Sequence, residues 1–104
     1  MTTLDPILQK FRAALTELYG DRIERVVLYG SRARGDAGPD SDYDVAVFLK
    51  GPTDTWEELK HIVEIEEAIF DAIGAEINTI PLAAESWVKR TPLMHEIRKD
   101  GMEL

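Results

Sequence analysis

The residues of this chain best suited to chemistry are two aspartates, Asp42 and Asp44, which stand two positions apart at the start of an apolar run. In a strand, residues two apart point to the same face, with their Cα atoms roughly 6.6 Å apart. Carboxylates at that spacing can bracket one divalent ion or share two. A hard, oxygen-preferring cation relieves their mutual repulsion and lost hydration, so we expect Mg²⁺ here.

A second group, Gly30 and Ser31, directly follows another apolar run, and ten residues separate Ser31 from Asp42. Gly30 has no side chain, so a phosphate can approach the backbone closely. Ser31 adds a hydroxyl and an N–H at the start of a possible helical turn. Either group alone is usually an ordinary turn or a solvated pair, but the two in this order predict a site for metal-bound phosphates.

Two arginines in the segment between these groups, Arg32 and Arg34, place positive charge nearby. We expect them to serve a polyphosphate or to pair with Asp40.

The two groups must be positioned by strands, and apolar periodicity together with glycine and proline breaks predicts the elements. In chain order we expect a helix over 5–19, a strand over 25–29, a loop over 31–41 that begins with a helical turn, a strand over 42–49, a helix over 53–73, a strand over 75–80 ended by Pro81, and helices over 83–89 and 92–99. This order predicts an α/β fold with a small mixed β-sheet of about three strands packed with helices. We expect one domain over residues 1–104.

The apolar positions also predict buried faces. We expect Val45, Val47 and Leu49 to continue the face of the two aspartates, which would put both acids at the end of a core-facing row. The helix over 53–73 should carry a wide apolar stripe. The stripe consists of Trp56, Leu59, Ile62, Val63, Ile69, Phe70 and Ile73.

Composition limits the kind of protein. The 104 residues carry a net charge of −8 and no cysteine, which excludes disulfides and thiolate metal sites. An acidic excess of this size disfavours direct nucleic-acid binding and suits a basic protein partner. The first six residues lack the pattern of a signal peptide, and no apolar run is long enough to span a membrane, so we expect a cytoplasmic protein.

The fuller strings, Gly-Ser-Arg-Ala-Arg-Gly-Asp over 30–36 and Ser-Asp-Tyr-Asp-Val-Ala-Val over 41–47, resemble the signature of the polymerase-beta-like nucleotidyltransferase superfamily. They are especially similar to the minimal nucleotidyltransferases, the MntA-type antitoxins. The resemblance covers the whole chain, because those proteins have about this length and a similar ending to residues 92–101. It implies the nucleotidyltransferase core fold.

The resemblance also implies roles for the site residues. Gly30 and Ser31 would hold the terminal phosphates of ATP, and Asp42 and Asp44 would bind two Mg²⁺ ions. A third carboxylate on a later strand normally completes the metal site, and the matching position here is Glu76. The family most often has aspartate there, so the longer side chain is a departure that could misplace a ligand.

The activity implied is that of a protein adenylyltransferase, an antitoxin that attaches AMP to a tyrosine of a HEPN-type RNase toxin. Two alternatives stay open. The chain could neutralise its toxin by binding alone, which the glutamate at position 76 favours modestly. It could also transfer a nucleotide to a small molecule, although such enzymes carry an added domain.

Overall fold

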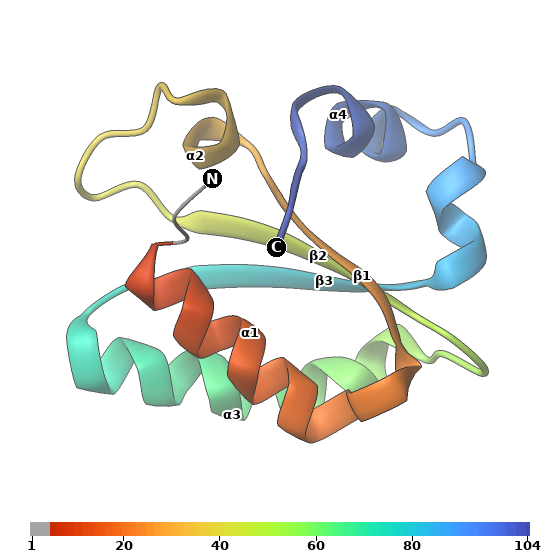
Figure 1. Cartoon of the computed structure of the whole chain (residues 1–104), viewed down its shortest axis with the longest axis horizontal. Helices are drawn as coiled ribbons and strands as arrows, with labels where there is room; N and C mark the ends of the chain where they lie inside the picture. Colours follow the sequence, from red (N-terminus) through yellow and green to blue (C-terminus); the bar gives the residue numbers. More distant parts are fainter. Residues whose placement is uncertain (1–4) are drawn as a thin grey trace.

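Residues 5–104 are described in the computed structural model, and their helices lie on both sides of one β-sheet (Figure 1). The elements in chain order are α1 (Pro6–Tyr19), the 3₁₀ helix η1 (Gly20–Arg22), β1 (Ile23–Tyr29), α2 (Ser31–Arg34), β2 (Tyr43–Leu49), α3 (Thr55–Ile73), β3 (Ile77–Ala83), the 3₁₀ helix η2 (Ala84–Val88), α4 (Pro92–Asp100) and β4 (Met102–Glu103). Residues 1–4 lie outside the described part of the chain, so the prediction that the first six residues form no signal peptide falls mostly on residues that the structure does not describe.

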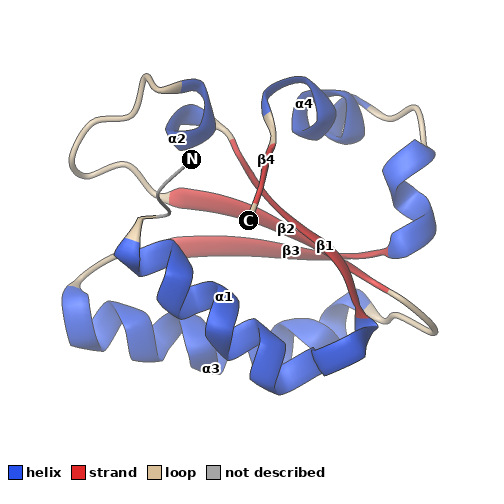
Figure 2. Ribbon diagram, viewed as in Figure 1, coloured by secondary structure: helices blue, strands red, loops and turns tan. Residues whose placement is uncertain are grey.

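The sheet has the strand order β3-β2-β1-β4, and it is mixed. β1 pairs antiparallel with β2 and with β4, whereas β2 and β3 are parallel and joined by α3 (Figure 2). The predicted α/β fold with a mixed sheet is therefore confirmed. The sequence analysis missed β4, because a two-residue strand after Gly101 has no periodicity to detect.

Two apolar clusters fill the two sides of the sheet. Val45, Val47 and Leu49 pack with α1 and α3, whereas Ala46 and Phe48 pack with α4. Our expectation that Val45, Val47 and Leu49 share the face of the aspartates is wrong. Side chains alternate with a period of two, so the even-numbered Asp44 shares its face with Ala46 and Phe48, on the α4 side.

The apolar stripe of α3 is only partly buried. Ile62 and Ile69 lie in the core, but the side chains of Val63, Phe70 and Ile73 stay exposed, by 38 %, 53 % and 49 %. Trp56, near the start of the helix, is 77 % exposed. The stripe is wider than the face that packs on the sheet, so part of it meets solvent.

The outer edge of β3 offers few free backbone donors. Alternate residues of a strand in a parallel pair turn their N–H groups away from the partner strand. On the outer side the Thr79 N–H donates to Glu66 Oε2 at 2.9 Å, and Pro81 has no N–H. Our expectation that Pro81 ends the strand is wrong, because an edge strand tolerates proline where a central one does not.

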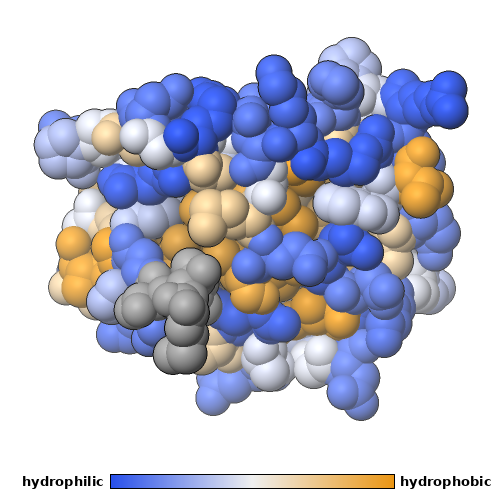
Figure 3. Space-filling model, turned by 45° about the horizontal axis from the view of Figure 1, so that its top comes forward, coloured by the Kyte–Doolittle hydropathy of each residue, from blue (hydrophilic) through white to orange (hydrophobic). Residues whose placement is uncertain are grey.

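Hydrophilic residues dominate the face of the molecule shown in Figure 3, with smaller apolar patches between them. None of the helices in residues 5–104 combines the length and the apolar character needed to cross a bilayer.

Candidate active site

The turn after β1 is built around Gly30. Its φ of 75° and ψ of −157° lie in a region of backbone conformation that residues other than glycine rarely adopt. The Gly30 carbonyl accepts the N–H groups of Ala33 and Arg34, both at 3.1 Å, and so starts the single turn of α2. A Cβ at Gly30 would lie 2.5 Å from Asp44 Oδ2, so only glycine lets the carboxylate come this close to the turn.

The two aspartates lie together beside this turn. Asp44 stands opposite Tyr29 in the β1–β2 register, one residue before Gly30. Asp42 and Asp44 both approach the amide of Asn78, so the two carboxylates are on one side of the sheet. The expected convergence of Gly30, Asp42 and Asp44 is present in the structure.

Burial raises the pKa of Asp44 above its ordinary value, and the charges of Asp42 and Glu96 raise it further. The Arg34 charge and a hydrogen bond from Asn78 act in the opposite direction. The net effect is a carboxylate whose negative charge is disfavoured in the free protein, and a bound cation would relieve this cost.

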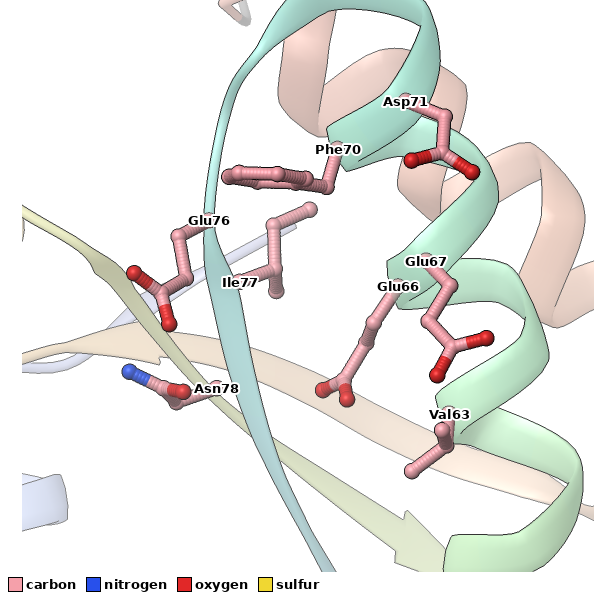
Figure 4. A pocket seen from close by; sticks show the side chains of 8 residues that line it. All are labelled: Val63, Glu66, Glu67, Phe70, Asp71, Glu76, Ile77 and Asn78. Atoms are coloured by element: carbon pink, nitrogen blue, oxygen red, sulfur yellow. The ribbon is translucent and has the colours of Figure 1, made fainter.

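The strand next to the aspartates brings Asn78, rather than Glu76, into contact with them. Asn78 is the register partner of Asp44, and its Nδ2 donates to Asp42 Oδ2 at 3.0 Å. Glu76 precedes β3, and its exposed side chain lies on the same side of the strand as Asn78 (Figure 4). Within residues 5–104, no three acidic, histidine or cysteine side chains gather closely enough to form a metal site.

Arg32 is engaged by the loop that follows it. Its Nε donates to the Ser41 carbonyl at 2.9 Å, and its guanidinium lies over the Tyr43 ring, 4.0 Å from the centroid. These contacts tie α2 to the start of β2 and leave Arg32 less free to meet a phosphate.

Arg34 connects α2 to α4. Its guanidinium pairs with Asp36 at 3.2 Å and with Asp100 at 3.6 Å, and it lies 4.0 Å from Glu96. Within residues 5–104, Arg34 does not form the ion pair with Asp40 that we considered from the sequence. Arg34 also lowers the pKa of Asp44, so its charge does act on the site.

Two further groups interact with Asp44 without having been predicted as site residues, Tyr29 of β1 and Glu96 of α4. Burial raises the pKa of the Tyr29 hydroxyl, and Asp44 and Glu96 add to this effect. Glu96 belongs to α4 and is far from the aspartates in the sequence, so no local pattern predicts its place near them. The packing of α4 on the sheet brings it to the site.

The residues matched by comparison with known families include all the predicted site residues. A family model described as a nucleotidyltransferase domain matches residues 8–94. The chain belongs to this family.

One curated relative of this nucleotidyltransferase-domain protein comes from Methanocaldococcus jannaschii. The two are 29 % identical over 98 residues, which cover 94 % of this chain and 95 % of the relative. The relative's name gives protein adenylyltransferase as a provisional activity.

Solved structures share the fold. A provisionally named nucleotidyltransferase from Sulfolobus solfataricus is 20 % identical, aligns over 93 % of this chain and 75 % of its own, and has a TM-score of 0.66. A mutant MntA–HpeT toxin–antitoxin structure is 20 % identical over 98 % of this chain and 72 % of that chain, also with a TM-score of 0.66. A Shewanella oneidensis structure of a tri-AMPylated HEPN toxin with its MNT antitoxin is 18 % identical over 91 % and 69 %, with a TM-score of 0.53. At these identities the structures establish the fold.

The donor atoms of this nucleotidyltransferase domain fit a hard divalent cation. Asp42 and Asp44 offer carboxylate oxygens on one side of the sheet, and Mg²⁺ takes oxygen ligands. The space that a Gly30 side chain would fill is occupied by Asp44 Oδ2. An ion held by this carboxylate would therefore lie beside the Gly30 turn, where phosphates bound to the ion could meet the start of α2.

Proposed function

We propose that this nucleotidyltransferase-domain protein is a Mg²⁺-dependent protein adenylyltransferase that moves AMP from ATP to a hydroxyl of a partner protein. The observation that carries the proposal is the placement of Asp42 and Asp44 together, against the Gly30 turn. Family membership gives the class of reaction, and the curated relative favours protein as the acceptor.

In the proposed reaction the acceptor oxygen attacks the α-phosphorus of ATP, the bond to the β-phosphate breaks, and diphosphate leaves with its electron pair. The hydroxyl proton passes to water. Mg²⁺ held by Asp42 and Asp44 would lower the pKa of the attacking hydroxyl and neutralise charge on the phosphates. Gly30 and Ser31 position the terminal phosphates, and Asn78 orients Asp42.

The acceptor we propose is a tyrosine of a HEPN-type RNase toxin, which this chain would inactivate as its antitoxin. Support comes from the neighbouring solved structures, one of which pairs an MNT antitoxin with an AMPylated HEPN toxin. The net charge of −8 also suits a basic partner.

The proposal is tested by intact-mass measurement of a HEPN-type RNase toxin taken as the candidate partner, after incubation with ATP and Mg²⁺. We expect the wild-type chain to add AMP, and Asp42→Asn or Asp44→Asn to reduce the rate at least about 100-fold, because each removes a metal ligand. Asp40→Asn, an exposed aspartate of the same loop, is the matched control and should keep full activity. Undiminished transfer by both site variants would exclude the two-aspartate mechanism.

A second candidate is an antitoxin that neutralises by binding alone. It is favoured by the exposure of Glu76 and by Asn78, which has no carboxylate, at the position opposite Asp44. Under this candidate Asp42→Asn still neutralises the toxin and leaves its mass unchanged. Glu76→Gln tests whether Glu76 is the third carboxylate of the site. A loss of AMP transfer would assign Glu76 to the site, and full transfer would show that the site does not need it.

A further inference from the structure

Beside the candidate site, an open groove runs along the outer edge of β3. It has a volume of about 570 Å³ and extends from the space between this strand and α3 around the edge to Glu76 and Asn78, whose side chains lie on the other side of the strand (Figure 4). We call it the edge groove. Its lining residues are Val63, Glu66, Glu67, Phe70, Asp71, Glu76, Ile77 and Asn78.

The edge groove has an apolar floor that the fold leaves uncovered. Phe70 and Val63 are two turns apart on α3, and their side chains are 53 % and 38 % exposed. Ile77, which is itself buried in the core, lies next to them on β3 (Figure 4). Exposed apolar side chains gathered in a groove and rimmed by polar groups are typical of an interaction site.

The rim of the edge groove is strongly negative. Four of its residues are carboxylates, Glu66, Glu67, Asp71 and Glu76, and none is a cation. Within residues 5–104, no lysine or arginine forms an ion pair with any of the four. Burial raises the pKa of Glu66, hydrogen bonds from Thr79 act in the opposite direction, and the charges of Glu67 and Glu76 raise it further, so a positive group in the groove would lower the repulsion among these acids.

The edge groove ends at the candidate site. Asn78 lines it and donates to Asp42. Glu76 and Phe70 line both the edge groove and a second hollow of about 350 Å³ that includes Asp42 and Ser41. A chain lying in the groove would therefore present one of its side chains close to the aspartates.

We propose that the edge groove is the docking site for a basic segment of the acceptor protein. An apolar side chain of that segment packs on Phe70 and Val63, its lysine or arginine side chains meet the carboxylates, and its hydroxyl reaches the aspartates. Addition of a strand at this edge is disfavoured, because Glu66 accepts the Thr79 N–H and Pro81 has no N–H. A second copy of this acidic chain is the less suitable occupant, since like charges would meet. This inference rests on the proposed function, because it names how the acceptor is held.

The test uses two short tyrosine-containing peptides and the full-length ¹⁵N-labelled chain, without nucleotide. One peptide carries several lysines and a leucine, and the other replaces each lysine by glutamate. We expect the lysine peptide to shift the amide resonances of residues 63–71 and 76–78, and to bind at least about tenfold more tightly than the glutamate peptide, which is about 1.4 kcal/mol. Its binding should weaken as salt is raised, because salt screens exposed charges.

Variants with matched controls on the same helix locate the binding. Glu67→Lys and Phe70→Ser change exposed groove residues and should weaken binding of the lysine peptide about tenfold. Glu64→Lys and Trp56→Ser change an exposed acid and an exposed aromatic outside the groove, and should leave it unchanged. Thermal unfolding of each variant confirms that the fold is retained.

Several results would overturn the docking proposal: equal binding of the two peptides, no binding of either at about 1 mM, or shifts that map elsewhere. Self-association that Phe70→Ser abolishes would assign the groove to a second copy instead. Asp44→Asn separates this proposal from the proposed function, because it should bind the lysine peptide normally but transfer AMP at least about 100-fold more slowly. Normal peptide binding by a wild-type chain that modifies no acceptor would reject the proposed function alone.

Discussion

Gly30 and the Asp44 carboxylate are in such close contact that residue 30 cannot carry a side chain without moving the acid. Gly30→Ala adds a Cβ that would lie 2.5 Å from Asp44 Oδ2, on a backbone with φ of 75°. We expect it to lower the free energy of unfolding by about 2 kcal/mol and to abolish nucleotidyl transfer. Urea unfolding and the toxin mass assay measure the two effects.

Gly51→Ala is the control for this prediction. Gly51 has a similar φ of 79°, but a Cβ there would have no atom within 4 Å. We expect a smaller loss of stability, about 1 kcal/mol, and unchanged transfer. Equal loss of activity in the two variants would mean that backbone strain, not displacement of Asp44, is the cause.

Asp44 also predicts how stability depends on pH. Its pKa is raised in the folded protein, so folding favours the protonated form, and stability falls as pH rises through the folded pKa. Asp44→Asn should therefore be more stable than wild type at neutral pH, by about 1 kcal/mol or less because the side chain is partly exposed. The gap should close below the unfolded pKa, where the wild-type carboxyl is protonated in both states.

Urea unfolding at several pH values, with and without Mg²⁺, measures this gap. Added Mg²⁺ should stabilise the wild-type chain and leave Asp44→Asn unchanged, since a ligand stabilises only the state that binds it. A stability difference that is constant from acid to neutral pH would contradict a raised Asp44 pKa.

Among the elements, the parallel pairing of β2 and β3 decides which residue joins the aspartates. Their register sets Asn78 opposite Asp44 and within hydrogen-bonding distance of Asp42. Groups that orient a metal ligand commonly affect metal affinity by 10- to 100-fold. We expect Asn78→Ala to weaken Mn²⁺ binding, used as a spectroscopic probe, by about tenfold.

Because Asn78 is exposed, its removal should leave the melting temperature unchanged, which separates positioning from folding. Unchanged Mn²⁺ affinity in Asn78→Ala would show that Asp42 needs no support from β3.

The elements also show where sequence reasoning reaches its limit. The spacing of Gly30, Asp42 and Asp44 predicted their convergence, because the antiparallel pairing of β1 and β2 brings the end of one strand to the start of the other. The contact of Asn78 and the approach of Glu96 depend on a strand register and on the packing of α4, neither of which is local in sequence. The predicted role of Glu76 as a third metal ligand stays a prediction.

For the whole molecule, Gly101 joins the last helix to the sheet. It lets the chain turn back from α4 so that β4 pairs with β1 and the Leu104 N–H reaches the Val26 carbonyl at 2.9 Å. A Cβ at Gly101 would collide with the Ile97 carbonyl oxygen and lie 2.5 Å from Val27 Cγ1. We expect Gly101→Ala to cost about 2 kcal/mol of unfolding free energy, through overpacking of the apolar cluster between α4 and the sheet.

Gly38→Ala is the comparison, because its Cβ would meet only Ser41 Oγ, at 4.0 Å. Urea unfolding should show a change of about 0.5 kcal/mol or less for Gly38→Ala. Similar losses for the two variants would mean that the chain end adjusts without disturbing α4.

At this scale the fold class and the order of the main elements were predictable, because long periodic segments flanked by glycine and proline determine them. The errors arose at the sheet. Alternation along β2 by itself places the aspartates on the face opposite Val45, so the error in assigning their face did not need the structure to correct it. The prediction that Pro81 ends the strand fails because the sequence does not show that β3 is an edge strand, and β4 is too short to detect.

The capped outer edge of β3 has a consequence for how partners can evolve. A free strand edge can form main-chain hydrogen bonds with any extended chain, but here Glu66 accepts the Thr79 N–H and Pro81 has no N–H to donate. If a partner docks in the edge groove, discrimination between cognate and non-cognate proteins would reside in the exposed side chains of α3, which can be exchanged one at a time without disturbing the sheet. Related pairs could diverge in specificity by such single exchanges while the catalytic framework stays the same.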